Sequence, residues 1–218
     1  MLFDCHSHFN SLNHVTILNI SGVNDEDIKC FSVGIHPWES SKIEDNFLSI
    51  EHLAKGEKCI AIGEIGLDKL KGPDILIQKN VFEKQIEISE KLKLPVIIHC
   101  VKAWNELKVL KQKLNPIQVW IYHGFNKIGI LEEVLESGLM ISIGSSILSN
   151  IKLQMHLELI PNDKLLLETD DSQIDIFDIY KKVSEIKKIS LSELEQIIEE
   201  NFKRIFRKWQ SGLNEQNY

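Results

Sequence analysis

The chain has 218 residues, of which 43% are hydrophobic and 26% are charged, and its formal net charge is −7. This composition is typical of a soluble globular protein, and no apolar run approaches the roughly 20 residues of a membrane helix. The acidic balance argues against tight, sequence-independent binding to long duplex DNA. It does not exclude a nucleic-acid substrate, because metal ions and a few lysines can make the contacts.

The cysteines and the start of the chain predict a cytoplasmic protein. Cys5, Cys30, Cys59 and Cys100 show no C-x-x-C spacing, and Asp4 is reached after only three residues. We therefore expect no targeting segment before the first strand, and reduced thiols in a cytoplasmic protein.

Short apolar runs alternate with longer amphipathic segments along the chain. The apolar runs predict strands at 2–9, 15–20, 29–35, 59–65, 95–100, 118–123, 139–143 and 164–168. Helical spacing of apolar residues predicts helices at 43–55, 74–93, 104–114, 128–136, 151–159, 174–188 and 192–209. The last helix is expected to start with a capping box, because Ser192 lies three residues before Glu195.

Eight strands, most of them followed by a helix, predict an α/β protein with a (β/α)8 TIM-type barrel over residues 1–210. Residues 211–218 are expected to form a polar tail. The alternative is an open doubly wound sheet, but no Gly-x-Gly-x-x-Gly follows a strand to support nucleotide binding there. The first two connections have only about six and about eight residues, whereas a crossover normally needs about a dozen. Two outer helices are therefore expected to be missing, and the barrel wall should be thinnest there.

Histidine and carboxylate residues recur where the predicted strands end. In a barrel, functional side chains come from the carboxyl ends of the strands. These positions are His6, His8, His36, Glu64, His99, His123 and Asp170. The alternative is that the histidines are hydrogen-bonded core residues.

The strand-end residues are suited to binding metal. Asp4, His6 and His8 alternate along the first strand and share one face, where two imidazoles form half of a metal site. The full set exceeds what one catalytic ion needs, so it predicts two divalent ions bridged by a carboxylate. Donors of this kind, without thiolate, suit zinc, manganese or magnesium, and the sequence does not choose among these metals.

The segments around these residues resemble the TatD family of metal-dependent hydrolases, within the amidohydrolase-like barrels, from Leu2 to about Phe206. The segments are Phe3-Asp4-Cys5-His6-Ser7-His8-Phe9-Asn10, Gly34-Ile35-His36-Pro37, Ala61-Ile62-Gly63-Glu64-Ile65-Gly66-Leu67-Asp68, Pro95-Val96-Ile97-Ile98-His99, His123-Gly124-Phe125 and Leu166-Leu167-Glu168-Thr169-Asp170. The resemblance implies a deoxyribonuclease acting on strand ends.

The resemblance also implies roles for single residues. His6, His8 and Asp170 would hold one metal ion, His99 and His123 would hold the second, and Glu64 would bridge the two ions. Asp170 would also act as the general base toward the attacking water.

Other residues around the site are expected to support the ligands or to contact the substrate. Asp4 and Asp68 are predicted to orient metal ligands through hydrogen bonds. The predicted substrate contacts are His36, Trp38, Lys102 and Lys127. Three positions depart from the family pattern. The positive charge of the family's arginine after His99 is displaced by one residue, to Lys102. Trp38 replaces the second histidine of His-Pro-His, and Asp171 stands where proline is common.

The leading functional prediction is a deoxyribonuclease or phosphodiesterase that uses a two-metal-activated water on DNA ends. The first alternative is a metal-dependent hydrolase of a small amide, ester or lactone, and the second is a catalytically inactive metal-binding protein. The partner is therefore nucleic acid or a small molecule, and the sequence leaves the oligomeric state open.

Overall fold

The centre of the structure is a sheet of eight parallel strands in sequential order, seen in a computed structural model that describes residues 1–20, 28–41 and 46–209. The strands are β1 (Phe3–Ser7), β2 (Val15–Ile20), β3 (Cys30–Val33), β4 (Cys59–Asp68), β5 (Val96–Val101), β6 (Trp120–Tyr122), β7 (Met140–Ile143) and β8 (Leu165–Leu167). Ser7 at the end of β1 pairs with Asp170, just after β8, so the sheet closes on itself. The predicted (β/α)8 barrel is confirmed.

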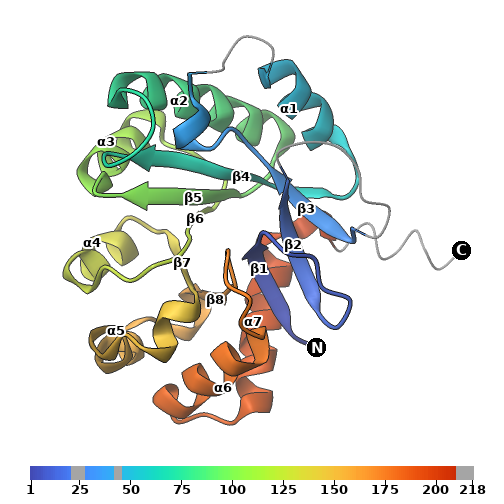
Figure 1. The fold of residues 1–218 in the computed structure, drawn as a ribbon, viewed down its shortest axis with the longest axis vertical. Coiled ribbons are helices and arrows are strands. Elements are labelled where there is room, and N and C mark those ends of the chain that lie inside the picture. The colour runs from blue at the N-terminus through green and yellow to red at the C-terminus, as the bar shows by residue number, and fades with distance from the viewer. Residues whose placement is uncertain (21–27, 42–45, 210–218) are drawn as a thin grey trace, which may run out of the picture.

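Helices surround most of the strands (Figure 1). The α-helices are α1 (Asn46–Lys55), α2 (Ile75–Leu92), α3 (Trp104–Leu114), α4 (Leu131–Glu136), α5 (Ile151–His156), α6 (Ile176–Lys187) and α7 (Leu191–Ile205). Short 3-10 helices are η1 (Pro37–Glu39), η2 (Ile128–Ile130), η3 (Ser145–Leu148), η4 (Leu157–Leu159) and η5 (Asn162–Lys164). None of the helices in the described part of the chain combines the length and apolarity needed to cross a bilayer.

The barrel wall is thin beside β1 and β2. Residues 8–14, which join these strands, contain no helix, as the short connection predicted. The last three residues of β2 are only half-buried, whereas all ten residues of β4 are buried, as expected for a parallel strand covered on both faces. The connection from β2 to β3 includes residues 21–27, which lie outside the described residues.

Helix α7 covers the seam between β1 and β8. Its fully buried Phe202 packs on Phe3 of β1, with ring centroids 4.7 Å apart. Truncation of such a buried aromatic side chain to alanine costs about 3–5 kcal/mol of folding free energy. The closing helix therefore holds the two ends of the sheet together.

Several predicted boundaries were wrong, and two of them have a clear physical reason. The fourth strand extends three residues further than predicted, through Asp68, because it stays paired with β5 as far as Val101. Helix α7 begins at Leu191, and its cap is Ser190, whose side chain accepts a hydrogen bond from the Glu193 amide, rather than Ser192. Residues 43–45 of the first predicted helix and the 211–218 tail lie outside the described residues.

All four cysteines are buried free thiols, as expected. Because all eight strands are parallel, the strand ends that carry the histidines and carboxylates lie at the same end of the barrel.

Candidate metal centre

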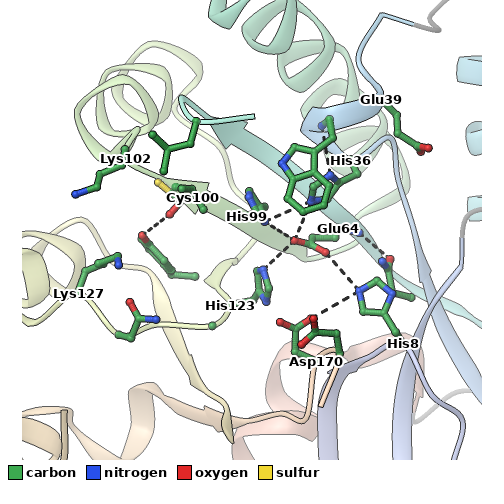
Figure 2. A pocket seen from close by; sticks show the side chains of 18 residues that line it. His8, His36, Glu39, Glu64, His99, Cys100, Lys102, His123, Lys127 and Asp170 are labelled. Atoms are coloured by element: carbon green, nitrogen blue, oxygen red, sulfur yellow. Dashed lines mark hydrogen bonds and ion pairs between the residues drawn. The ribbon is translucent and has the colours of Figure 1, made fainter. Parts of the chain in front are cut away.

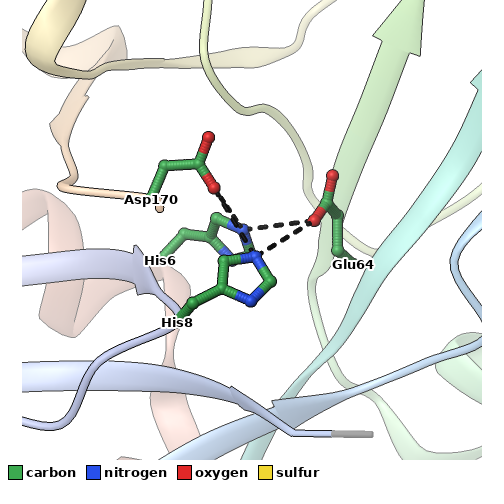
Figure 3. Close-up of side chains that lie close together, drawn as sticks. All are labelled: His6, His8, Glu64 and Asp170. Carbon is green, nitrogen blue, oxygen red and sulfur yellow. Dashed lines mark ion pairs between the residues drawn. The ribbon is translucent and has the colours of Figure 1, made fainter. Parts of the chain in front are cut away.

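Two histidines and two carboxylates from the first, fourth and eighth strands converge at the mouth of the barrel (Figure 3). One atom from each of His6, His8, Glu64 and Asp170 lies within 4.8 Å of the others. The His6 Nε2 atom is 3.4 Å from Glu64 Oε2 and 3.5 Å from Asp170 Oδ1. The corresponding His8 Nε2 distances are 3.8 and 3.6 Å. We call these four residues the first cluster.

The buried His6 ring faces two carboxylates but has no hydrogen bond from the protein. It is fully buried, yet neither ring nitrogen makes a hydrogen bond. An unpaired polar group of this kind is costly in a protein interior. Burial lowers the pKa of His6, but the carboxylates of Asp170 and Glu64 outweigh burial and raise it to about 9. The position is therefore one where a cation, either a proton or a metal ion, is stabilised.

The other oxygen of Glu64 faces three further histidines (Figure 2). Glu64 Oε1 lies 2.6 Å from His99 Nδ1, 2.9 Å from His123 Nε2 and 3.3 Å from His36 Nε2. His36, Glu64 and His99 form a second group of converging donor atoms, which we call the second cluster. Glu64 is thus shared by two groups of ligands, one on each carboxylate oxygen.

The backbone of β4 positions Glu64. The pairing of β4 with β5 shifts register between Ile62 and Ile65, an irregularity that re-aims the intervening side chains. The Glu64 amide donates a 2.9 Å hydrogen bond to Asn19 Oδ1 of β2. Burial opposes ionisation of Glu64, but the surrounding histidines, His123 foremost, hold its pKa well below the usual range. Glu64 therefore remains an anion.

Carboxylates behind the donors fix two of the imidazoles. His99 Nε2 lies 3.2 Å from Asp68 Oδ2, and the same oxygen accepts a 2.7 Å hydrogen bond from the Trp38 indole. His123 Nδ1 lies 3.3 Å from Oε1 of the fully buried Glu168, which also accepts the Gly124 amide at 2.5 Å. Such partners set the tautomer and orientation of ligand histidines.

Asp4 supports the backbone around the first cluster. Its carboxylate accepts hydrogen bonds from the Thr169 hydroxyl at 2.6 Å, the Thr169 amide at 3.1 Å and the His6 amide at 3.3 Å. Burial of Asp4 outweighs these hydrogen bonds and raises its pKa. Asp4 thereby joins β1 to the turn that carries Asp170.

Asp170 lies at the point where the barrel closes. Its amide donates to the His6 carbonyl, and its carbonyl accepts from the His8 amide, both at 2.9 Å. Its φ is 56°, a conformation that costs a non-glycine residue energy and is concentrated at functional sites. Burial opposes ionisation of Asp170, but His6 and His123 lower its pKa, so this carboxyl remains charged.

Every residue of the two clusters except the buried His6 lines a cavity of about 610 Å³. His36, Trp38, Lys102 and Lys127 line this cavity, as does Asp171. Lys102 and Lys127 lie across the cavity from His8 and Glu39 (Figure 2). Lys71 Nζ lies 3.3 Å from the centre of the Trp38 ring, so one face of the indole is already covered.

The donor set fits divalent cations. The converging atoms are imidazole nitrogens and carboxylate oxygens, a combination that suits zinc, manganese and magnesium. The buried His6 ring, placed between two carboxylates without a hydrogen bond, would gain its missing partner from such an ion.

The sequence profile described as TatD related DNase matches residues 5–207 of the chain. The chain belongs to the TatD family. A 3'-5' ssDNA/RNA exonuclease TatD from Musicola paradisiaca is 32% identical, with 84% of this chain and 79% of that protein aligned. A metal-dependent hydrolase, YabD, from Bacillus subtilis is 27% identical, with 95% of this chain and 99% of that protein aligned.

Solved structures share the barrel. YJJV, a TatD homologue from Escherichia coli K12, superposes with a TM-score of 0.80 at 20% identity and covers 94% of this chain and 97% of its own. A TatD family hydrolase from Entamoeba histolytica gives a TM-score of 0.76 at 23% identity, covering 88% and 84%. The predicted TatD resemblance and fold are both confirmed.

The structure brings the six predicted metal ligands of this TatD protein close together: five of them line the cavity, and His6 is fully buried next to Glu64 and Asp170. His36 was expected to contact the substrate, and its ring converges with Glu64 and His99 in the second cluster. His123 contacts the same Glu64 oxygen. Sequence reasoning assigned no role to Asn19 or Glu168. Each is a polar residue in or next to a mainly apolar strand, a position that could have marked it.

Proposed function

We propose that this TatD protein is a two-metal nuclease that hydrolyses phosphodiester bonds at the ends of nucleic-acid strands, DNA foremost. The observation that carries the proposal is the geometry around Glu64. One of its oxygens faces His6, whose ring has no hydrogen bond, and the other faces a second set of histidines. A carboxylate shared between two donor groups is the arrangement that two-metal phosphoryl-transfer sites use. The relative from Musicola paradisiaca is named as an ssDNA/RNA exonuclease, which supports the same class of substrate.

The residues divide naturally between two ions. His6, His8 and Asp170 would hold one ion, and Glu64 would bridge to the other. His99 and His123 would hold the second ion, with His36 as a further donor. The metal would be magnesium, manganese or zinc. When bound, such ions lower the pKa of a water molecule and neutralise charge that develops on the phosphoryl group.

The protein's own groups would position the substrate and move the proton. Asp170 is available as a general base because its pKa is held low and its carboxylate faces the cavity. Lys102 and Lys127 would bind phosphate oxygens from the opposite side. Asp4 and Asp68 would keep the ligands in place through the hydrogen bonds described above.

The proposal is tested with chelated protein that is reloaded with magnesium, manganese or zinc. We expect hydrolysis of end-labelled single- or double-stranded DNA only after an ion is added, and none from Asp170→Asn or His99→Ala. His52→Ala, which alters an exposed histidine on α1, serves as the matched control and should retain activity. Full nuclease activity after chelation, or in His99→Ala, would contradict the proposal.

A second candidate is hydrolysis of a small uncharged amide, ester or lactone. Glu39, Glu64, Asp170 and Asp171 all line the cavity, and this negative surface favours an uncharged substrate over a polyanion. A phosphodiester dye compared with a panel of lactones separates the two functions. Metal binding without turnover of either substrate would instead indicate a metal-binding protein that is not an enzyme.

A further inference from the structure

A second cavity of about 460 Å³ adjoins the metal cavity. The two share Lys102, Tyr122, Asn126 and Lys127 as a common wall. Lys69 and Lys152 also line the second cavity, which we call the lysine pocket. A substrate strand that leaves the metal cavity across this wall enters the lysine pocket directly.

The four lysines come from successive connections of the barrel. Lys69 follows β4, Lys102 follows β5, Lys127 lies between β6 and η2, and Lys152 is in the first turn of α5, which follows β7. Because neighbouring parallel strands end at one edge, their positive charges are brought together. This concentration contrasts with the net charge of −7 of the whole chain.

Most of this positive charge is unpaired. Lys102, Lys127 and Lys152 are exposed, and none forms an ion pair with any residue in the described ranges. Lys69 pairs with Glu106 at 2.8 Å, and Glu106 is the single acidic residue among the described residues that line the pocket. Neighbouring ammonium groups repel one another unless an anion lies between them. The pocket is therefore suited to an anion, whereas the metal cavity beside it has four carboxylates and is suited to cations.

The backbone of Lys102 adds a second observation. Its φ is 53°, in the left-handed region. Lys93, Asn115 and Lys188 share this conformation as ordinary helix C-caps. Outside such caps, the non-glycine residues of the described chain with positive φ are Lys102 and Asp170, and both line the metal cavity. Strain that is kept at a cavity wall indicates that the position of the side chain matters.

Two aromatic residues among those that line the lysine pocket, Trp104 and Tyr122, are held in place. Trp104 and Tyr122 pack together with ring centroids 6.2 Å apart. The Trp104 indole donates to Glu133, and the Tyr122 hydroxyl donates to the Cys100 carbonyl at 2.8 Å. Aromatic and lysine side chains that line one pocket match a nucleotide unit, which has both a ring system and a phosphate.

We propose that the lysine pocket binds a backbone phosphate of a single-stranded nucleic acid, adjacent to the bond cleaved in the metal cavity. This inference rests on the proposed nuclease function and narrows its substrate to strands longer than one phosphodiester unit. A concave pocket at the barrel mouth admits one flexible strand, whereas a rigid duplex would lie across its rim.

The test compares a substrate that spans both cavities with one that fits in the metal cavity alone. Metal-loaded wild type, Lys152→Glu and Lys152→Arg are assayed on a single-stranded oligonucleotide of about eight residues and on bis(p-nitrophenyl) phosphate. Lys152 is chosen because it lines the lysine pocket and not the metal cavity. Lys181→Glu, at an exposed position on α6 that lines neither cavity, is the matched control.

We expect Lys152→Glu to lower the ratio of kcat/KM for the oligonucleotide to kcat/KM for the dye about tenfold, mainly through KM. Lys152→Arg should restore the ratio. The slope of log kcat/KM against log salt concentration should become shallower by about 0.7 for each phosphate that the variant no longer neutralises. An unchanged ratio in Lys152→Glu, or an equal change in Lys181→Glu, would overturn the inference while leaving the nuclease function intact.

Failure of the nuclease function itself gives a different result, because wild type would then hydrolyse neither substrate with any of the three metals. Binding of a labelled, uncleavable phosphorothioate strand tests the pocket separately from turnover. Weaker binding to Lys152→Glu than to wild type and to Lys181→Glu supports the lysine pocket, and equal binding to all three proteins overturns it.

Discussion

The two clusters that meet at Glu64 differ in how far the protein satisfies them. In the first cluster, His6 is fully buried and its ring nitrogens make no hydrogen bond. In the second, His99 lies near Asp68, and His36 Nδ1 accepts the Trp38 amide at 3.3 Å. His123, beside the second cluster, is likewise held by Glu168.

This difference indicates an order of binding. A donor without a protein partner gains most from a cation, whereas donors that already have partners exchange one interaction for another. We therefore expect the first cluster to bind its ion more tightly, and the second cluster to fill at higher metal concentration.

The largest effect is expected from the residue that both clusters share. Glu64→Gln removes the charge that each ion needs, so both ions should be lost and turnover should fall about 10³-fold or more. Metal content by mass spectrometry and DNA hydrolysis measure this, with the exposed Glu57→Gln as control. Two ions retained by Glu64→Gln would show that the clusters do not depend on a common ligand.

A smaller and asymmetric effect is expected from one ligand in each cluster. After dialysis against low metal concentration, His6→Asn should retain no ion, and His36→Asn should retain one. Both variants should lose activity, by about 10²-fold for His36→Asn, because second-ion binding is weakened. If His36→Asn lost the tightly bound ion instead, the order of binding would be reversed.

The metal-free protein should lose stability as the pH rises. Asp170 and Glu64 raise the pKa of His6 to about 9 against the effect of burial, so the folded state favours the protonated ring. This contribution is complete below the unfolded pKa of about 6.5 and is lost as pH rises through about 9. It amounts to on the order of 3 kcal/mol. Thermal unfolding of chelated protein between these pH values measures the effect.

The metal-loaded protein provides the comparison, because a bound ion takes the place of the proton at the first cluster. Its thermal midpoint should therefore change less over the same pH range. If the thermal midpoint decreased equally with and without metal, the pH dependence would come from groups away from the first cluster.

The smallest effect is expected behind the second cluster. Asp68→Asn keeps the size of the side chain but weakens the interactions with His99 and Trp38, so affinity for the second ion should fall about tenfold. Metal titration of activity measures this, and the tightly bound ion should be unaffected. A loss of the tightly bound ion would mean that Asp68 supports the whole centre rather than one half.

Much of the barrel and the donor set could be predicted from the sequence. The eight apolar runs gave the order of the strands, and parallel strands bring their carboxyl ends together, so His6, Glu64, His99 and Asp170 were expected near one another. Local pattern was sufficient because these residues lie in or next to strands whose direction is fixed by burial.

The depth and the supporting contacts of the donors could not be predicted. His36 follows β3 by three residues, and its ring is turned inward by the η1 helix, whose Trp38 amide donates to it. Asn19 and Glu168 act through contacts with residues far away in the chain, which no periodicity encodes. The starting point of α7 was missed because two serines two residues apart, Ser190 and Ser192, offered competing caps.

The seam that closes the barrel also determines when the metal centre can exist. Ser7 and Asp170 pair across 163 positions of sequence, and the hydrogen bonds beside this pair run between the backbones of ligand residues. During synthesis the amino-terminal part of a chain emerges first, so His6 and His8 are present long before Asp170. The centre is therefore completed in one late step, when the eighth strand reaches the first. A nascent or truncated chain that stops before Asp170 carries most of the candidate ligands but has no assembled site.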